Sequence, residues 1–297
     1  MQVNVEYKPQ FEAVRSYCYE GTEPGPHLLF LGGVHGNEVC GQRALSALKD
    51  ELESGSLHIQ KGKLTIVPYA NPWACASFKR YMEKNLNRVI GHHENPQAYE
   101  ERLACQIAKL IDDCDVLVDL HSISSYCPAP FVFNDFPKPE NDKLCHAVGG
   151  HFIVKNWQEM FTEHPGHEVC GTQLYAEKAG KTGCLIECGQ HEDDRAIDVA
   201  ARAVRNAMKL YGLIPGEPVI PEFKGEIIGK KAFVKRGEGK MTSTDWHHLK
   251  SVEKGTVIAE YDNGEKLAVP EDGYLLLPYH GAQIGDEWFY FGQLLKK

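Results

Sequence analysis

An apolar run that ends in two glycines, a histidine and a glutamate constrains this chain more than any other feature. Residues 28–31 are apolar and lead through Gly32-Gly33 into His35-Gly36-Asn37-Glu38, after which residues 41–52 have helical spacing. This order predicts a strand, a tight turn and a helix start at one point. Ligands of an open α/β sheet bind at the carboxyl ends of its strands, so we expect His35 and Glu38 to face a site there.

A second strand-like run supplies a third candidate ligand. It is short and apolar, as is typical of a buried strand, and it ends directly before His121. Imidazole and carboxylate groups suit a catalytic zinc, which keeps one position for water. A lone His-x-x-Glu is more often a capping carboxylate beside a loop histidine than a metal site, so the metal prediction depends on His121 joining His35 and Glu38. Asp119 and Ser122 are candidate partners that would orient the His121 ring.

The alternation of strand-like and helix-like runs predicts the fold class. Residues 1–212 read as an α/β catalytic domain with a mostly parallel or mixed central sheet and helices on both faces. Residues 213–222 read as a linker, and residues 223–297 as a small β-rich domain with glycine-containing turns. The first 26 residues suggest an opening hairpin, and residues 73–94 suggest a long irregular connection, a type of segment that is usually functional.

Composition narrows the classes of partner. Hydrophobic residues at 42% and charged residues at 25% are ordinary for a globular enzyme, and a net charge of −9 argues against nucleic-acid binding. No run approaches the roughly 20 apolar residues of a membrane span, and the N-terminus lacks a signal-peptide core. The ten cysteines have no paired spacing, which favours free thiols and a cytoplasmic location. We therefore expect a small-molecule substrate and no nucleic-acid or membrane partner. Homo-oligomerisation is left open.

Four motifs together resemble the succinylglutamate desuccinylase and aspartoacylase family, a branch of the zinc carboxypeptidase-like amidohydrolases. In chain order they are His35-Gly36-Asn37-Glu38; Asn71-Pro72 with Arg80-Tyr81 and Asn85-Leu86-Asn87-Arg88; Asp119-Leu120-His121-Ser122; and Ile186-Glu187-Cys188-Gly189. The resemblance implies a zinc carboxypeptidase-like fold and one Zn²⁺ per chain, held by His35, Glu38 and His121. It also implies hydrolysis of an N-acyl amino acid to a carboxylate and a free amino acid, with a β-rich C-terminal domain leaning over the cleft.

Glu187 is the candidate proton carrier. It stands near the end of an apolar run, where burial would raise its pKa toward the working range of a base, and the resemblance implies the catalytic glutamate here. By resemblance, Arg80 polarises the scissile carbonyl, while Asn87 and Arg88 hold the α-carboxylate of the substrate. Guanidinium groups bind carboxylates through paired hydrogen bonds and stabilise oxyanions. The alternatives are a buried glutamate paired with a structural cation and a solvated basic loop.

The chain departs from the family pattern in two places. Asn85 stands where the family commonly has an aspartate, and an amide would orient a neighbouring arginine less strongly. No arginine occurs between Arg102 and Arg195, whereas aspartoacylase-like members use one in this region to bind the side-chain carboxylate of the substrate. The family arginine stands shortly before the strand of the catalytic glutamate, where this chain offers only Lys178 and Lys181 as cations. An N-acyl amino acid with a different side chain is therefore as consistent with the sequence as an acidic one.

Two other functions fit the same residues. A metallocarboxypeptidase acting on short peptides would use the same ligands and arginines, although a closed cleft would exclude peptides. A zinc-containing binding protein with a vestigial site would keep the metal without turnover, but Glu187 and Arg80 beside an open coordination position favour an enzyme. Cobalt, manganese or iron would also suit these ligands.

The remaining histidines lie in loop-like contexts. Solvated positions are expected for His92-His93, His164, His167 and His247-His248. His191 follows Glu187 by four positions, and contact with the cleft rim is a less favoured option for it.

Overall fold

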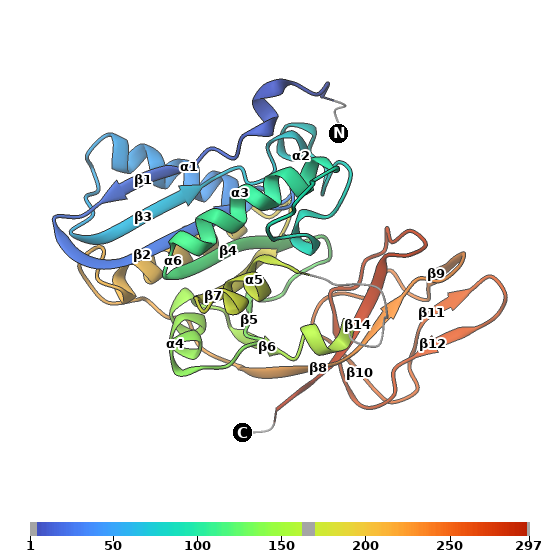
Figure 1. Ribbon diagram of the computed structural model, residues 1–297. Helices are drawn as coiled ribbons and strands as arrows, with labels where there is room; N and C mark the ends of the chain where they lie inside the picture. The colour runs from blue at the N-terminus through green and yellow to red at the C-terminus, as the bar shows by residue number, and fades with distance from the viewer. Residues whose placement is uncertain (1–4, 162–169, 296–297) are drawn as a thin grey trace.

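A wide mixed sheet runs through the computed structural model, which describes residues 5–161 and 170–295 (Figure 1). The predictions for His164 and His167 lie outside these residues. In spatial order the sheet contains β1 (Tyr17–Glu20), β3 (Lys61–Val67), β2 (Glu23–Gly32), β4 (Val116–Ile123), β7 (Thr182–Gln190), β5 (Phe131–Phe133), β6 (Phe152–Lys155), β8 (Gly225–Val234), β14 (Glu287–Leu294), β13 (Gly273–Leu276) and β10 (Lys250–Val252). A second sheet contains β12 (Lys266–Ala268), β11 (Val257–Tyr261) and β9 (Gly239–Met241).

Strands β3, β2, β4 and β7 are parallel, so their carboxyl ends meet at one edge. Within this edge Gly32 pairs with Leu120, and His121 pairs with Glu187. All eight residues of β4 are buried, which explains its apolar run because a central parallel strand is covered on both faces. The short β5 runs antiparallel to β7 and brings Phe131 opposite Glu187.

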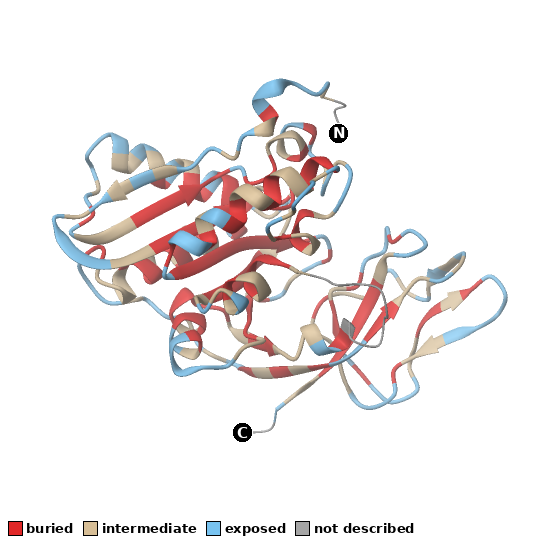
Figure 2. Ribbon diagram, viewed as in Figure 1, coloured by how far each residue is buried: buried red, intermediate tan, exposed pale blue. Residues whose placement is uncertain are grey.

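Helices cover both faces of this sheet, as the sequence predicts. The helices are α1 (Val39–Glu53), α2 (Pro72–Ser77), α3 (Tyr99–Asp113), α4 (Pro139–Val148), α5 (Thr172–Lys178) and α6 (Arg195–Leu210), and short 3-10 turns span Pro9–Glu12, Leu86–Arg88 and Gln158–Phe161. Helices α1, α4 and α6 pack in one apolar cluster, and α3 with α5 packs in another on the opposite face. Figure 2 shows the buried residues concentrated along the strands and the inner sides of these helices. The predicted α/β class is confirmed.

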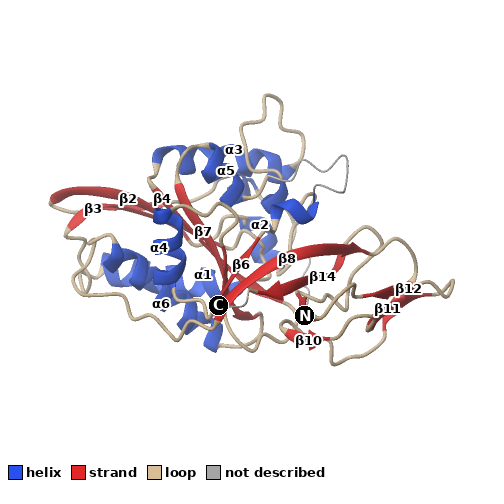
Figure 3. Ribbon diagram, turned by 90° about the horizontal axis from the view of Figure 1, so that it is seen from below, coloured by secondary structure: helices blue, strands red, loops and turns tan. Residues whose placement is uncertain are grey.

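The β-rich C-terminal part continues the same sheet. Strand β8 is parallel to β6, and β14, β13 and β10 then follow in antiparallel pairs. Figure 3 shows β8 and β14 extending away from the helices toward the small sheet that contains β11 and β12. Residues 211–224, which include the predicted linker, contain no helix or strand. The division at 212 and 223 stays a prediction, since backbone hydrogen bonds cross from β6 to β8.

Two expectations for the N-terminal half are wrong. The opening hairpin does not form, because β3 and β4 occupy both edges of β2 and β1 pairs with β3 instead. The connection at 73–94 is not wholly irregular, because Asn71 caps α2 by accepting a hydrogen bond from the Ala74 N–H at 3.4 Å. No helix in the described residues is long and apolar enough to cross a membrane.

Candidate active site

The structure brings His35, Glu38 and His121 together in a buried cluster at the carboxyl edge of the sheet. His35 and Glu38 lie in the loop between β2 and α1, and His121 lies near the end of β4. The Glu38 carboxylate is central, with Oε1 2.8 Å from His35 Nδ1 and Oε2 2.9 Å from His121 Nδ1. One ligand atom from each residue lies within 4.8 Å of the others. Three donors converge on one point, as the spacing of the motifs predicts.

Two glycines allow the loop to take this path. Gly33 has φ +64°, a left-handed conformation that side chains other than glycine rarely adopt. At Gly36 an added Cβ would lie 2.1 Å from the carbonyl carbon of Ala74, because α2 packs directly against the loop. The histidine and the glutamate of the motif are thus held against the first turns of two helices.

The outer nitrogen of each histidine faces a polar partner. His35 Nε2 lies 3.0 Å from Asn85 Oδ1, and His121 Nε2 lies 2.9 Å from Asp119 Oδ2. The Thr172 hydroxyl donates to the same Asp119 oxygen at 2.6 Å. Such contacts fix the ring orientation and leave both Nδ1 atoms for a metal. Asn85 therefore orients a histidine and not the neighbouring arginine that the sequence predicts.

Ser122 has a different role from the predicted one. Its backbone N–H donates to Glu38 Oε2 at 3.1 Å, while its hydroxyl lies 2.9 Å from His191 Nδ1. The side chain therefore does not orient His121. The ring of His191 is thus held beside the residue that follows a candidate ligand, a position that the sequence did not favour.

The local charges suit a cation. Burial, followed by the charge of Arg80, lowers the pKa of His35 to about 4, so this imidazole is neutral at pH 7. Burial alone would raise the pKa of Glu38, but His35 and His121 hold it well below its usual value. For His121, the carboxylates of Asp119 and Glu38 outweigh burial and raise the pKa. Two imidazoles and one ionised carboxylate form the donor set of a catalytic zinc site, and zinc would displace the protons now shared with Glu38.

Glu187 lies beside this cluster on the neighbouring strand. It pairs in register with His121, is 8% exposed, and its Oε2 has no hydrogen-bond partner among the described residues. Burial, followed by the nearby charge of Glu38, raises its pKa to about 8. A buried carboxyl oxygen without a partner costs stability, so its presence points to a function.

Of the predicted substrate residues, Arg80 contacts the cluster directly, and Asn87 and Arg88 lie further along the same segment. Arg80 Nη1 donates to Glu38 Oε1 at 2.9 Å, and its side chain is 43% exposed. Asn87 Oδ1 accepts from the Thr172 N–H at 2.9 Å, which leaves its amide nitrogen as the group to offer a ligand. Arg88 donates to the Asn87 carbonyl at 3.0 Å and contacts Glu287 Oε1 at 3.5 Å.

Glu100 supports this loop and was not identified from the sequence. Its fully buried carboxylate accepts backbone N–H groups of Met82, Glu83 and Lys84 at 2.7, 3.1 and 3.0 Å. It also accepts from Asn71 Nδ2 at 3.3 Å. This single side chain holds the segment that connects Arg80 with Asn85. The sequence shows only an acidic residue in the first turn of a helix, so no local signal identifies the contact.

The C-terminal part also reaches the site. Glu287 of β14 contacts Arg88. Burial, followed by the charge of Glu287, raises the pKa of the buried Tyr290, while Arg88 and Arg80 act in the opposite direction. The predicted solvated position of His248 is wrong, because this residue is fully buried and stacks on Phe131 with ring centroids 4.1 Å apart.

The two lysines considered as substitutes for the family arginine lie elsewhere. Lys181 directly precedes the first residue of β7 and donates to the Asp112 carbonyl at 2.7 Å. Lys178 is the last residue of α5 and is exposed. Both are therefore at the opposite edge of the sheet from Glu187.

Comparisons with known proteins identify relatives of this chain. Residues 24–211 match the succinylglutamate desuccinylase/aspartoacylase catalytic domain. The chain is 26% identical over 204 residues to the N-alpha-acetyl-L-2,4-diaminobutyric acid deacetylase of Halomonas elongata, a match that covers 67% of this chain and 58% of that protein. It is 24% identical over 275 residues to the N-acyl-aromatic-L-amino acid amidohydrolase (carboxylate-forming) of Rattus norvegicus, covering 81% of each.

Solved structures show the same fold. A succinylglutamate desuccinylase/aspartoacylase from Rhodobacter sphaeroides superposes with a TM-score of 0.76 at 18% identity, covering 95% of this chain and 89% of that one. The named relatives are deacylases and amidohydrolases. On the match of its catalytic domain, the chain belongs to the succinylglutamate desuccinylase/aspartoacylase family.

Proposed function

We propose that this protein is a zinc-dependent amidohydrolase that cleaves an N-acyl amino acid into a carboxylate and a free amino acid. The observation that carries the proposal is the position of Glu187, a buried carboxyl group paired in register with His121 of the three-residue cluster. The relatives that act on acylated amino acids support the substrate class.

His35, Glu38 and His121 would hold one Zn²⁺ per chain. When bound, such an ion activates water and polarises a carbonyl oxygen. Asn85 and Asp119 orient the two rings, so the donors are arranged before the metal binds.

Glu187 would accept a proton from the attacking water and return it to the leaving nitrogen. Its raised pKa, caused mainly by burial, suits a group that must both accept and release a proton near neutral pH. Register with His121 places it on the same face of the sheet as that ring.

Arg80 and Arg88 supply the positive charge that an anionic substrate needs. Arg80 already lies against Glu38, so its partly exposed guanidinium can donate to the carbonyl oxygen as negative charge develops there. Arg88 and the amide nitrogen of Asn87 would bind the α-carboxylate. Glu287 contacts Arg88 from the C-terminal part, which supports a cleft closed on that side.

A buried aromatic series packs beside Glu187 and makes this side of the site apolar. Phe131 lies opposite Glu187 in the sheet, and Phe133, Trp157 and Tyr290 extend the series with ring centroids 5.4, 4.7 and 4.2 Å apart. The rat relative, by its name, acts on acylated aromatic amino acids. No disulfide links any of the ten cysteines, which supports a reducing, cytoplasmic compartment.

Turnover of a substrate panel by the zinc-loaded Glu187→Gln variant tests the proposal. The panel contains N-acetyl and N-succinyl derivatives of aromatic, aliphatic, acidic and basic amino acids, together with dipeptides. We expect wild-type hydrolysis of an acylated amino acid, at least a ~10³-fold loss of kcat in Glu187→Gln with zinc content unchanged, and no effect of the neighbouring Glu192→Gln.

Three other outcomes would contradict the proposal. Preferred cleavage of dipeptides would support a metallocarboxypeptidase instead. Zinc binding without turnover of any substrate would support a vestigial site, and full activity of Glu187→Gln would remove the proposed proton carrier.

A further inference from the structure

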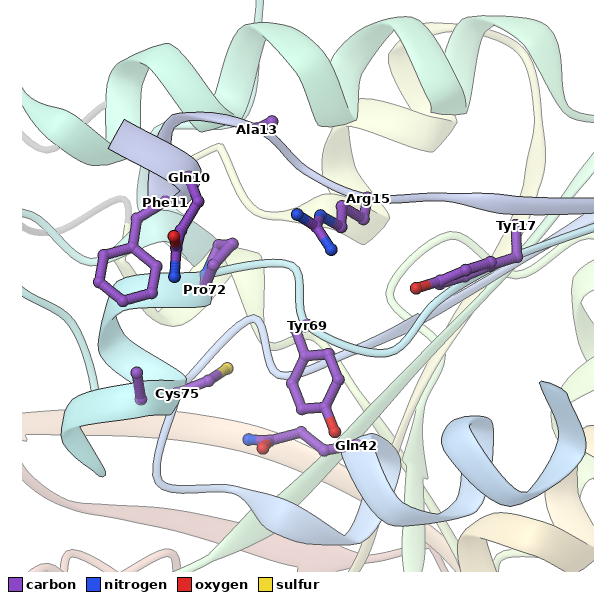
Figure 4. Close-up of a pocket in the computed structure, with 10 residues that line it drawn as sticks. Gln10, Phe11, Ala13, Arg15, Tyr17, Gln42, Tyr69, Pro72 and Cys75 are labelled. Atoms are coloured by element: carbon purple, nitrogen blue, oxygen red, sulfur yellow. The ribbon is translucent and has the colours of Figure 1, made fainter. Parts of the chain in front are cut away.

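A cavity of about 370 Å³ lies between the N-terminal segment, α1 and α2 (Figure 4). None of the residues shown lining it belongs to the candidate active site described above. Its volume is at the lower end of the range for small-molecule sites. The cavity is therefore large enough for a ligand of its own.

The lining has the chemistry of a site for an organic anion. Among the ten lining residues, Arg15 carries the only charge, and Figure 4 shows its guanidinium directed into the space between the N-terminal segment and Tyr69. Tyr17 and Tyr69 contribute phenol groups, whereas Phe11 and Pro72 contribute apolar surface. Arg15 and Tyr69 are exposed, so the guanidinium lies at the open side of the cavity and the apolar surface lies deeper. This arrangement suits a carboxylate on an apolar body.

We propose that this cavity is a second ligand site, which binds a small monocarboxylate with an apolar or aromatic body. A free amino acid fits less well, because its ammonium group would find no carboxylate among the lining residues and would lie near Arg15. Binding in the cavity does not depend on the hydrolase proposal, whereas the effect of binding on metal loss rests on the zinc site proposed there.

Two lining residues connect the cavity to the loop that carries His35 and Glu38. Gln42 Nε2 donates to the carbonyl of Gly36 at 2.9 Å and to that of Glu38 at 3.3 Å. On the other side of the cavity, Cys75 Sγ donates to the carbonyl of Gly33 at 3.4 Å. The loop is therefore hydrogen-bonded to two side chains that a ligand would touch.

The packing leaves this loop little room to absorb a change locally. A Cβ at Gly36 would lie 2.1 Å from Ala74, and one at Gly33 would lie 2.8 Å from Cys75 Sγ. A ligand that orders Gln42 and Cys75 should thus stabilise the loop and slow the loss of a metal held by it. Ligand binding in the cavity should therefore change the rate at which the metal is lost, and this rate can be measured.

Calorimetric titration of benzoate into the zinc-loaded protein tests the proposal. Arg15→Gln should weaken binding at this site about tenfold or more, since it removes a charged hydrogen-bond partner. Arg43→Gln is the matched control, because Arg43 is an exposed arginine of α1 that pairs only weakly, at 3.4 Å, with an exposed Asp194. We expect Arg43→Gln and Arg88→Gln to retain the binding, and acetate and inorganic phosphate to bind less well than benzoate.

Zinc removal by a chelator provides the second measurement. Benzoate should slow removal in the wild type and in Arg43→Gln but not in Arg15→Gln. Loss of benzoate binding in Arg88→Gln rather than Arg15→Gln would assign it to the active site and overturn the proposal. Absence of binding, equal binding of phosphate, or a benzoate-independent rate of zinc removal would also overturn it.

Discussion

We expect His248, a side chain outside the candidate active site, to make the stability of this protein depend on pH. Its ring is fully buried against Phe131, and its Nδ1 accepts the N–H of Leu277 at 3.3 Å. Its Nε2 has no hydrogen-bond partner in the part of the chain that is described. Burial, followed by the charge of His247, lowers its pKa from 6.5 to about 3. Replacing His248 with a side chain that does not titrate should therefore change the acid stability.

The direction and size of the effect follow from proton linkage. The unfolded chain binds a proton at this histidine below pH 6.5, whereas the folded chain does so only below about pH 3. The stabilisation is fully present above pH 6.5 and is lost as the pH falls from 6.5 toward 3. Between pH 7 and pH 5 the contribution of His248 to the free energy of unfolding should fall by about 2 kcal/mol.

Urea unfolding of the metal-free protein at pH 7 and pH 5 measures this difference. With an m value of about 3 kcal/mol/M, the wild-type midpoint should fall by about 0.6 M more than that of a variant without the histidine. His248→Phe keeps the stacking on Phe131 but loses the acceptor for Leu277, whereas His248→Gln can keep an acceptor. The two variants should differ from each other at pH 7 but share the smaller pH dependence.

The comparison refutes the reasoning if wild type and both variants lose equal stability between pH 7 and pH 5. Fluorescence and far-ultraviolet circular dichroism should report the same midpoint, since the free energies require a two-state transition. Excess chelator in every sample keeps metal binding from contributing to the difference.

Two further variants test the supports of the candidate site. Asp119→Asn should weaken zinc binding by about 10- to 100-fold, because His121 loses a charged partner. Competition with a chromogenic chelator measures the zinc affinity. An affinity equal to that of the wild type would contradict this role of Asp119. The exposed carboxylate of Asp112 provides the matched Asn control. Glu100→Gln should retain zinc but lower the free energy of unfolding by about 1–3 kcal/mol and raise KM, since it replaces an acceptor of three backbone N–H groups. An unchanged KM would show that this loop does not position Arg80.

The candidate metal ligands were predictable because each stands at the end of a locally recognisable strand. The apolar runs that become β2 and β4 have clear ends, and parallel strands bring such ends to one edge. His35, Glu38 and His121 could therefore be grouped without knowledge of the loops. Glu187 follows the same rule on β7.

Pairing partners were harder to predict than the strands themselves. The run that becomes β1 precedes β2 closely enough for a hairpin, and only the occupation of both β2 edges excludes it. The contacts of Glu100 and Glu287 have the same difficulty. Glu100 binds backbone groups that carry no sequence signal, and Glu287 contacts an arginine 199 positions earlier in the chain.

The position of β5 explains how the C-terminal part acts on Glu187. Because β5 pairs antiparallel with β7, Phe131 shares a sheet face with Glu187, and His121 flanks the same glutamate from β4. His248 then stacks on Phe131 from the C-terminal part. Burial is the largest cause of the raised pKa of Glu187. Because Phe131 lies opposite Glu187 and His248 stacks on Phe131, we infer that the C-terminal part helps to keep water away from this carboxyl group.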